Sequence, residues 1–117
     1  MSFSIGSSLS ALRAFGTKMS VTANNVANVS SDGFKKSRAV LEEGRGDAVT
    51  VDIQKIDTPG PLVQDTRGTE PVERELSNVD LAEELPRTIP TSRGYEANIE
   101  VVRTRDEMLG TVIDLLE

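Results

Sequence analysis

Cysteine, histidine and tryptophan are all absent from this 117-residue chain. Without Cys, neither a disulfide framework nor a thiolate metal site is possible, and without His most nucleophilic and zinc sites are excluded as well. The acidic pairs that remain, Glu42-Glu43, Glu83-Glu84 and Asp106-Glu107, are expected on solvated faces. A carboxylate-based hydrolase would need two acids converging in a pocket, and the sequence shows no sign of one. We therefore expect a non-enzymatic protein without catalytic residues, metal or cofactor.

Large side chains are scarce too, because the aromatic residues number only four: Phe3, Phe15, Phe34 and Tyr95. An isolated domain of this size normally relies on bulky buried side chains to offset the loss of chain entropy. We expect one small domain, or a rod-like subunit whose core is completed by neighbouring molecules.

The chain also lacks a basic patch, and its net charge of −6 argues against nucleic acid as a partner. Residues 1–31 contain two bases and no acid, whereas residues 79–117 contain four bases and nine acids. The two ends can therefore attract each other, although exposed ion pairs contribute only ~0.2–1 kcal/mol each.

Long apolar runs are missing, since no segment approaches the roughly 20 residues that span a bilayer. The first residues, Met-Ser-Phe-Ser-Ile, also lack the basic region and the apolar stretch of a Sec signal. We expect no membrane insertion, and a different export route if the protein leaves the cytoplasm.

What the chain does have is a regular apolar pattern near its N-terminus. The pattern alternates steps of four and three, as in a heptad, at Ile5, Leu9, Leu12, Gly16, Met19, Ala23 and Val26. It predicts a helix that starts near Gly6 or Ser4 and ends in the polar cluster of residues 24–31. Gly16 and Ala23 would let a partner helix come close. An ordinary amphipathic helix on a globular core is an equally good interpretation.

The polar stretch of residues 23–36 follows this helix. Its amides, hydroxyls and glycine are typical of a helix end followed by a turn. The turn-forming residues are Asn24, Asn25, Asn28, Asp32 and Gly33.

Residues 37–78 have a β-like character. Val49, Val51 and Ile53 alternate with polar residues, which predicts a short strand that ends at the break of residues 58–61. Leu62 and Val63 begin a second expected strand, and residues 68–71 form another turn. This section is either a small β-hairpin packed against the helices or a partly mobile loop.

The last section again predicts helix. Ser77 or Asn78 can cap a short helix through Leu85, and Pro86 and Pro90 then predict a break at residues 85–88. A new helix is expected from residues 89–91, with a second four-and-three seam at Tyr95, Ile99, Val102, Asp106, Leu109, Ile113 and Leu116. Asp106 either sets the register of this seam or lies at its edge.

The expected fold is thus mainly α. The N- and C-terminal helices form a coiled-coil-like antiparallel pair, with a short β-hairpin or loop insert between them. The boundaries are residues 1–36 for the N-terminal helix and polar turn, 37–78 for the insert, and 79–117 for the C-terminal helix, interrupted near Pro86 and Pro90.

Several of these segments resemble the axial proteins of the bacterial flagellum, the rod and hook family. The N-terminal motifs are Ser-Ser-Leu-Ser-Ala-Leu-Arg at 7–13, Ala-Asn-Asn-Val-Ala-Asn-Val at 23–29 and Asp-Gly-Phe-Lys-Lys-Ser-Arg at 32–38. The C-terminal motifs are Asn-Val-Asp at 78–80, Ser-Arg-Gly-Tyr-Glu-Ala-Asn at 92–98, Glu-Val-Val-Arg-Thr at 100–104 and Met108. Together they resemble the proximal rod proteins of the basal body most.

The resemblance implies a structural rod subunit for flagellum-dependent motility, located in the periplasmic span of the basal body. It implies export through the flagellar type III apparatus without a cleaved signal peptide, and helical self-assembly with other rod subunits. The family's C-terminal helix usually continues through residues 85–92, where this chain has its two prolines. The short insert also suits a proximal rod protein better than a hook protein.

From this we derive packing roles, both within a subunit and between neighbours, for two sets of residues. They are Ile5, Leu9, Leu12, Met19 and Val26 on the first helix, and Ile99, Val102, Leu109, Ile113 and Leu116 on the second. The three Asn side chains of the polar turn are expected to contribute contacts between subunits. The alternative is a coiled-coil adaptor or regulator of flagellar type III export that does not polymerise.

Overall fold

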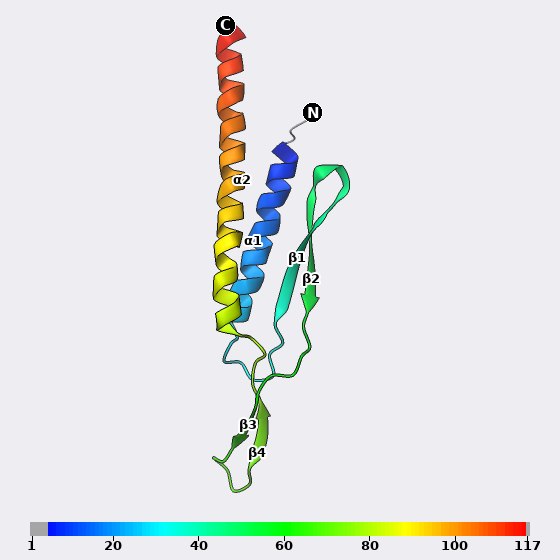
Figure 1. The fold of residues 1–117 in the computed structure, drawn as a ribbon, viewed down its shortest axis with the longest axis vertical. Helices are drawn as coiled ribbons and strands as arrows, with labels where there is room; N and C mark the ends of the chain where they lie inside the picture. The colour runs from blue at the N-terminus through cyan, green and yellow to red at the C-terminus, as the bar shows by residue number, and fades with distance from the viewer. Residues whose placement is uncertain (1–4, 117) are drawn as a thin grey trace.

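The computed structural model describes residues 5–116, which form a long, narrow molecule of 83 × 24 × 16 Å (Figure 1). Its radius of gyration is 21.2 Å, whereas a compact domain of this length would have about 13 Å. Two helices run side by side in opposite directions, and the β insert lies between them in the chain (Figure 1).

Helix α1 spans Ile5–Ala27, as the apolar pattern predicted. Its most buried positions carry small or polar side chains: Ser8, Ala11, Ala14, Thr22 and Asn25. Four large residues of the predicted heptad seam lie beside this stripe and are only half-buried or exposed: Leu9, Leu12, Met19 and Val26. Small side chains let α2 and the first hairpin approach α1 closely, which explains why the heptad seam does not coincide with the buried face.

The close approach between the two helices occurs at Gly94 rather than at Gly16. A Cβ atom at Gly94 would lie 2.6 Å from Cζ of Phe15, whereas a Cβ at Gly16 would meet nothing within 4 Å. The expectation that Gly16 admits the partner helix was therefore wrong. The missing side chain of Gly94 makes room for the Phe15 ring.

Helix α2 spans Leu81–Leu116 without interruption, so the predicted break near Pro86 and Pro90 was wrong. Ala82, Pro86 and Pro90 share the exposed face of the helix. The carbonyl groups that lose a partner to the prolines, those of Ala82 and Pro86, can bind water there. The opposite face, which contains the buried Glu84 and Thr91, keeps its packing.

The N-terminal cap of α2 is Asp80 rather than Ser77 or Asn78. The Ala82 N–H donates to Oδ1 of Asp80 at 3.0 Å, and the Glu84 N–H donates to the Asp80 carbonyl at 3.0 Å. These are the bonds of a helix N-cap. Ser77 and Asn78 lie in the segment before it, which leaves the Asn78 side chain free for other contacts.

The insert contains two antiparallel hairpins. Strands β1 (Ser37–Glu43) and β2 (Val49–Lys55) pair around the short helix η1 (Arg45–Asp47), and β3 (Leu62–Asp65) pairs with β4 (Val72–Glu75). The predicted strand at residues 49–53 is present, and irregular segments without strand structure lie at residues 58–61 and 68–71, where the breaks were expected. The partner of that strand is β1, which precedes it and which the sequence reasoning missed, rather than the segment that starts at Leu62.

Helix α1 lies between α2 and the β1–β2 hairpin (Figure 1). The backbone N–H of Val49 donates to the Ser10 hydroxyl at 3.0 Å, which ties the hairpin to α1. The buried apolar residues among residues 5–116 are three alanines, Ala11, Ala14 and Ala39. The prediction of a mainly α fold with a β insert is confirmed at this level, while coiled-coil packing of the helices remains a proposal.

Candidate assembly surface

The residues predicted to pack between subunits are distributed over both helices. Leu12, Met19, Val26 and Val102 are half-buried, whereas Leu9, Ile99, Leu109, Ile113 and Leu116 are exposed. Ile5 begins α1, but its side chain lies outside what the structure describes, as does Ser4, the alternative helix start. Within the monomer, most of the predicted packing residues of α1 are partly covered by the rest of the chain, whereas most of those of α2 are exposed.

The end of α2 extends beyond the N-terminus of α1 (Figure 1). Six large apolar side chains are exposed on this last part of the helix: Met108, Leu109, Val112, Ile113, Leu115 and Leu116. Leu115 and Leu116 are 81% and 82% exposed. A contiguous apolar surface of this kind is typical of a protein interaction site.

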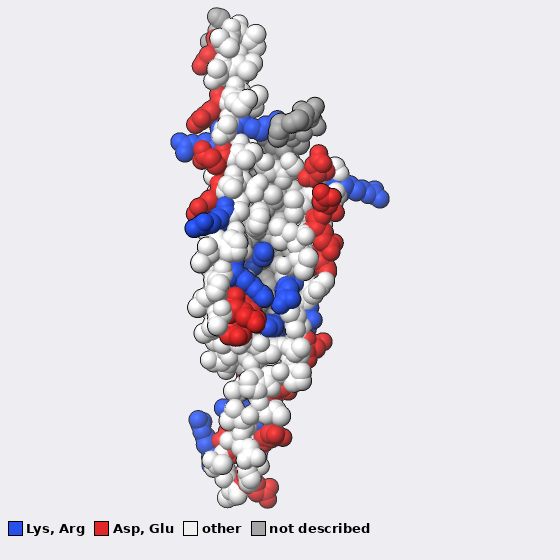
Figure 2. All heavy atoms as spheres, in the orientation of Figure 1, with Lys and Arg blue, Asp and Glu red and all other residues white. Residues whose placement is uncertain are grey.

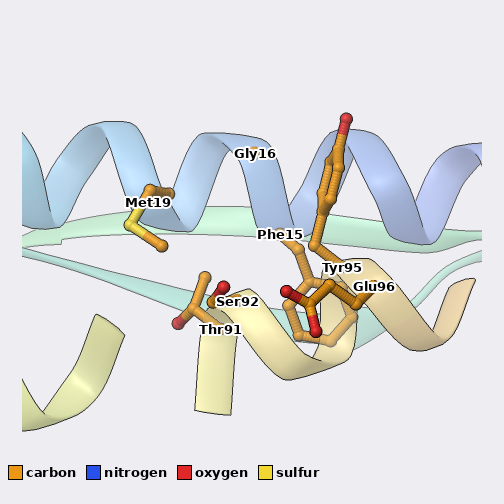
Figure 3. Close-up of a pocket in the computed structure, with 7 residues that line it drawn as sticks. All are labelled: Phe15, Gly16, Met19, Thr91, Ser92, Tyr95 and Glu96. Atoms are coloured by element: carbon orange, nitrogen blue, oxygen red, sulfur yellow. The ribbon is translucent and has the colours of Figure 1, made fainter. Parts of the chain in front are cut away.

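A groove between the helices adds a second apolar feature. Phe15 and Met19 reach from α1 toward α2, and Tyr95 reaches back from α2 (Figure 3). Gly16, Thr91, Ser92 and Glu96 complete the lining of this cavity of about 370 Å³. Its size and its mostly apolar wall suit an apolar side chain from a neighbouring molecule.

The lower end of α1 is joined to β1 and α2 by Asn25. The Asn25 amide donates to the Ser37 carbonyl at 2.8 Å and to Oε2 of Glu84 at 3.3 Å, and its oxygen accepts the Ser37 N–H at 3.0 Å. Asn25 is 1% exposed. Its side chain therefore acts within the chain and has no surface for the contact between subunits that the sequence suggested.

The other predicted turn residues are accessible. Asn28 donates to the Asn24 carbonyl at 2.8 Å, and Asp32 forms an ion pair with Arg74 at 3.4 Å. Gly33 has a φ of +70° and its N–H donates to the Glu75 carbonyl at 3.0 Å. Gly33 therefore supplies a left-handed backbone at the exit from α1, where a side chain would be strained.

Asn78 holds together the segments that cross below the helices. Its oxygen accepts the Lys36 N–H at 2.7 Å, and its amide donates to the carbonyls of Ile56 at 2.8 Å and Thr58 at 3.0 Å. In the sequence, Asn78 is a candidate helix cap and the first residue of the Asn-Val-Asp motif at 78–80. A single Asn has no periodic signal that would have shown these long-range bonds.

Glu75 links the second hairpin to the same region. It forms an ion pair with Lys35, and Oε1 also accepts the Gly60 N–H at 3.0 Å. The Lys35 ammonium, followed by the Gly60 N–H, lowers the pKa of Glu75 below its ordinary value of 4.5. A Cβ at Gly60 would lie 2.0 Å from the Leu76 carbonyl oxygen, so only glycine fits there.

Glu84 departs from the prediction that its acidic pair is solvated, because it is 1% exposed. Its neighbour Glu83 is exposed and pairs with Lys36 at 3.5 Å. The signal was available in the helical spacing: on a continuous helix, Glu84 lies about 200° from Pro86, opposite the face that the prolines share. This position of Glu84 was not predicted, because a helix break was expected between Glu84 and Pro90.

No helix within residues 5–116 is long and apolar enough to cross a membrane. The described residues also contain no group of three acidic side chains that could hold a metal ion.

Comparisons with known proteins agree with the two-ended pattern. Residues 5–35 match the family described as flagella basal body rod protein, and residues 75–115 match the flagellar basal body rod FlgEFG protein C-terminal family. Both matches fall on the helices and their adjoining turns.

Three relatives show how far the similarity extends. The flagellar hook protein FlgE of Escherichia coli K12 is 42% identical over 41 residues, which cover 35% of this chain but only 10% of the hook protein. The flagellar basal-body rod protein FlgC of Borreliella burgdorferi is 28% identical over 97% of this chain and 96% of its own length. FlgC of Escherichia coli O157:H7 is 29% identical over 86% of each chain.

The near full-length similarity is therefore to basal-body rod proteins, and the similarity to the hook protein covers one short segment. The alignment with the Borreliella protein runs over 146 positions, more than the 117 residues of this chain, so that relative contains residues with no counterpart here. The two family matches and these relatives show that this chain is similar to the flagellar basal-body rod proteins at both ends and, over most of its length, to the rod protein FlgC.

Proposed function

We propose that this chain is a structural subunit of the flagellar basal-body rod that polymerises through its terminal helices and so supports flagellum-dependent motility. The observation that carries the proposal is the uncovered apolar end of α2. Exposed apolar surface favours burial by ~25 cal/mol per Å². A neighbouring helix that covered this end would supply a driving force for association.

In this proposal the helices of neighbouring subunits pack in a coiled-coil-like inner layer, and the β insert faces outward. Leu109, Ile113 and Leu116 contact the neighbour, while Leu12, Met19 and Val102 contribute to packing within the subunit. The groove beside Phe15 and Tyr95 receives an apolar side chain from the next molecule. Because contacting surfaces differ on the two partners, the assembly is open-ended and helical.

The proposal extends to partners and location. The chain assembles with itself and with other rod subunits in the periplasmic span of the basal body, and the flagellar type III apparatus exports it. The family similarity at both ends of the chain supports these assignments, and the narrow shape of the molecule is compatible with export and with a rod-like assembly.

The test is a double substitution, Leu109→Asp with Ile113→Asp, compared with Asp114→Asn on the same exposed part of α2. We expect the double variant to lose self-association in sedimentation velocity, and cells carrying it to lose motility and to yield basal bodies without this chain. The Asp114→Asn control should behave like the unmodified protein. Normal rods and swimming in the double variant would contradict the proposal. Intact rods with only a change in export timing would favour the non-polymerising adaptor.

A further inference from the structure

A charged recess lies between α1, β1 and α2, away from the apolar helix end. Its charged lining residues are Lys18 of α1, Arg38 of β1, and Glu84 and Arg87 of α2, and its volume is about 330 Å³. On the face shown in Figure 2, basic side chains gather around a small acidic group between α2 and the β1–β2 hairpin. The recess is thus lined mainly by basic side chains and lies where β1 begins.

The charges of this recess are incompletely matched. Lys18 and Arg38 have no ion-pair partner within the part of the chain that the structure describes. Arg87 is already paired, since its Nη1 lies 3.7 Å from Oε1 of Glu84 and its Nη2 lies 3.9 Å from Oε2 of Glu83. Oε1 of Glu84 has no hydrogen-bond partner although the residue is 1% exposed. A buried carboxylate oxygen without a hydrogen bond is costly, and no donor among the described residues lies within hydrogen-bond distance of this one.

The opposite pattern occurs at the tip of the β1–β2 hairpin. Glu42, Glu43 and Asp47 are exposed there, without ion-pair partners among residues 5–116, and Arg45 lies among them. The upper part of the hairpin in Figure 2 is correspondingly acidic with one protruding base. The tip is three acids around one base, whereas the recess is three bases around one acid.

We propose that the acidic hairpin tip of one copy of this chain docks into the basic recess of a second copy. The acids of the tip would pair with Lys18, Arg38 and Arg87, and Arg45 would supply the donor that Oε1 of Glu84 lacks. This inference rests on the proposed function, because it names a second contact of the same assembly. The tip lies at one end of the β1–β2 hairpin and β1 lines the recess at the other end, so the two cannot meet within one molecule and the partner is a second copy.

The geometry of the hairpin defines the resulting arrangement. Arg38 and Glu43 are five residues apart along β1, which is ~17 Å at about 3.3 Å per residue, and Arg45 lies just beyond the end of this strand. A neighbour displaced by this distance along the long axis would place its tip at the height of the recess. Tip and recess are different surfaces, so the contact repeats from copy to copy without closing.

Cysteine cross-linking tests the contact directly, since the chain has no Cys of its own. An Arg38→Cys variant is mixed with a Glu43→Cys variant under mild oxidation, and the mixed disulfide dimer is quantified by mass spectrometry. The control mixes Glu43→Cys with Arg67→Cys, because the Arg67 side chain is 88% exposed but lies on the β3–β4 hairpin. We expect at least about tenfold more mixed dimer from the first pair, and equal yields would overturn the proposal.

Charge reversal provides a second measurement. Arg38→Glu and Glu43→Arg should each weaken self-association about tenfold or more, because like charges then face each other, and a chain with both changes should recover it. Each single variant should keep the helical circular dichroism of the unmodified chain, since both side chains are exposed. Failure of the double reversal to restore association would overturn the inference.

The two proposals fail in different ways. If Leu109→Asp with Ile113→Asp abolishes association while the charge reversals do not change it, the hairpin contact is refuted and the apolar polymerisation remains. If the charge reversals and cross-links behave as expected while the apolar double variant still associates, the hairpin contact stands and polymerisation through the end of α2 is refuted.

Discussion

At the scale of single residues, two carboxamides connect segments that are distant in sequence. Asn25 joins α1 to Ser37 and to Glu84, and Asn78 joins Lys36 to the segment after β2. A primary amide suits both positions because it offers two donors and an acceptor in a fixed plane. These side chains hold together the region from which both hairpins and both helices emerge.

Asn25→Ala should lower the free energy of unfolding by about 2 kcal/mol, because it removes the hydrogen bonds of Asn25 to the Ser37 backbone groups and to Oε2 of the buried Glu84. Chemical denaturation followed by circular dichroism measures the change. Asn28→Ala is the matched control, since Asn28 lies on the next turn and its bonds to Asn24 and Ser31 are exposed. If the two substitutions lowered the free energy of unfolding equally, Asn25 would stabilise the protein no more than an ordinary residue at a helix end.

The ion pair of Glu75 predicts a specific acid sensitivity. Because the pKa of Glu75 is lowered in the folded state, its stabilising contribution is complete above the unfolded-state pKa and is lost as the pH falls through the folded-state pKa. The free energy of unfolding should therefore decline below about pH 4.5.

Glu75→Gln should reduce this decline and should also weaken the protein at neutral pH, where the contact with Lys35 is missing. Denaturation curves between pH 3 and pH 7, roughly the interval over which carboxylates titrate, measure both effects. Glu73→Gln on the same strand is the control, as Glu73 is exposed. An unchanged pH dependence in Glu75→Gln would contradict the assignment.

At the scale of elements, α2 shows how tertiary context can override a local rule. Proline in a helix interior costs ~3 kcal/mol relative to alanine in model systems, yet α2 continues through Pro86 and Pro90. Both prolines lie on the exposed side, so the packing of Glu84 and Thr91 against the rest of the molecule is undisturbed.

Pro86→Ala with Pro90→Ala should therefore raise the free energy of unfolding by about 1–3 kcal/mol while leaving the helical circular dichroism signal nearly unchanged, because alanine only improves a helix that already exists. An increase in helical signal by several residues would show that the helix of the native chain is interrupted at the prolines. Ala82→Ser on the same exposed face is a control for substitution there.

At the scale of the whole molecule, the narrow shape leaves much of the apolar surface outside any core. The described buried apolar side chains are alanines, whereas the large apolar residues of α2 are exposed along its free end. A monomer of this kind gains little from its own packing, and in the proposed assembly its neighbours would cover this apolar surface.

The midpoint of denaturation should accordingly rise with protein concentration, because association buries surface that only the folded chain presents. Leu109→Asp with Ile113→Asp should remove this dependence and leave the midpoint at the value of the dilute protein. Denaturation curves measured over about two decades of concentration test the prediction, and a midpoint independent of concentration in the unmodified chain would contradict it.

The sequence by itself determined what depends on local pattern. The four-and-three spacing from Ile5 to Val26 specified α1, the alternation at Val49, Val51 and Ile53 specified β2, and the Pro and Gly clusters marked both turns. The motifs at the two ends also indicated the similarity to flagellar rod proteins, because the two family matches fall on the same regions.

The tertiary structure decided which faces these elements bury. Only packing against β1 and α2 selects the small residues Ala11 and Ala14 as the inner face of α1 in place of its heptad seam. Only the tertiary fold places Asn25 beside Glu84 and Asn78 beside Ile56. Periodicity is a local property of the chain, whereas burial and long-range hydrogen bonds depend on what lies opposite each residue, and no spacing within one segment contains that information.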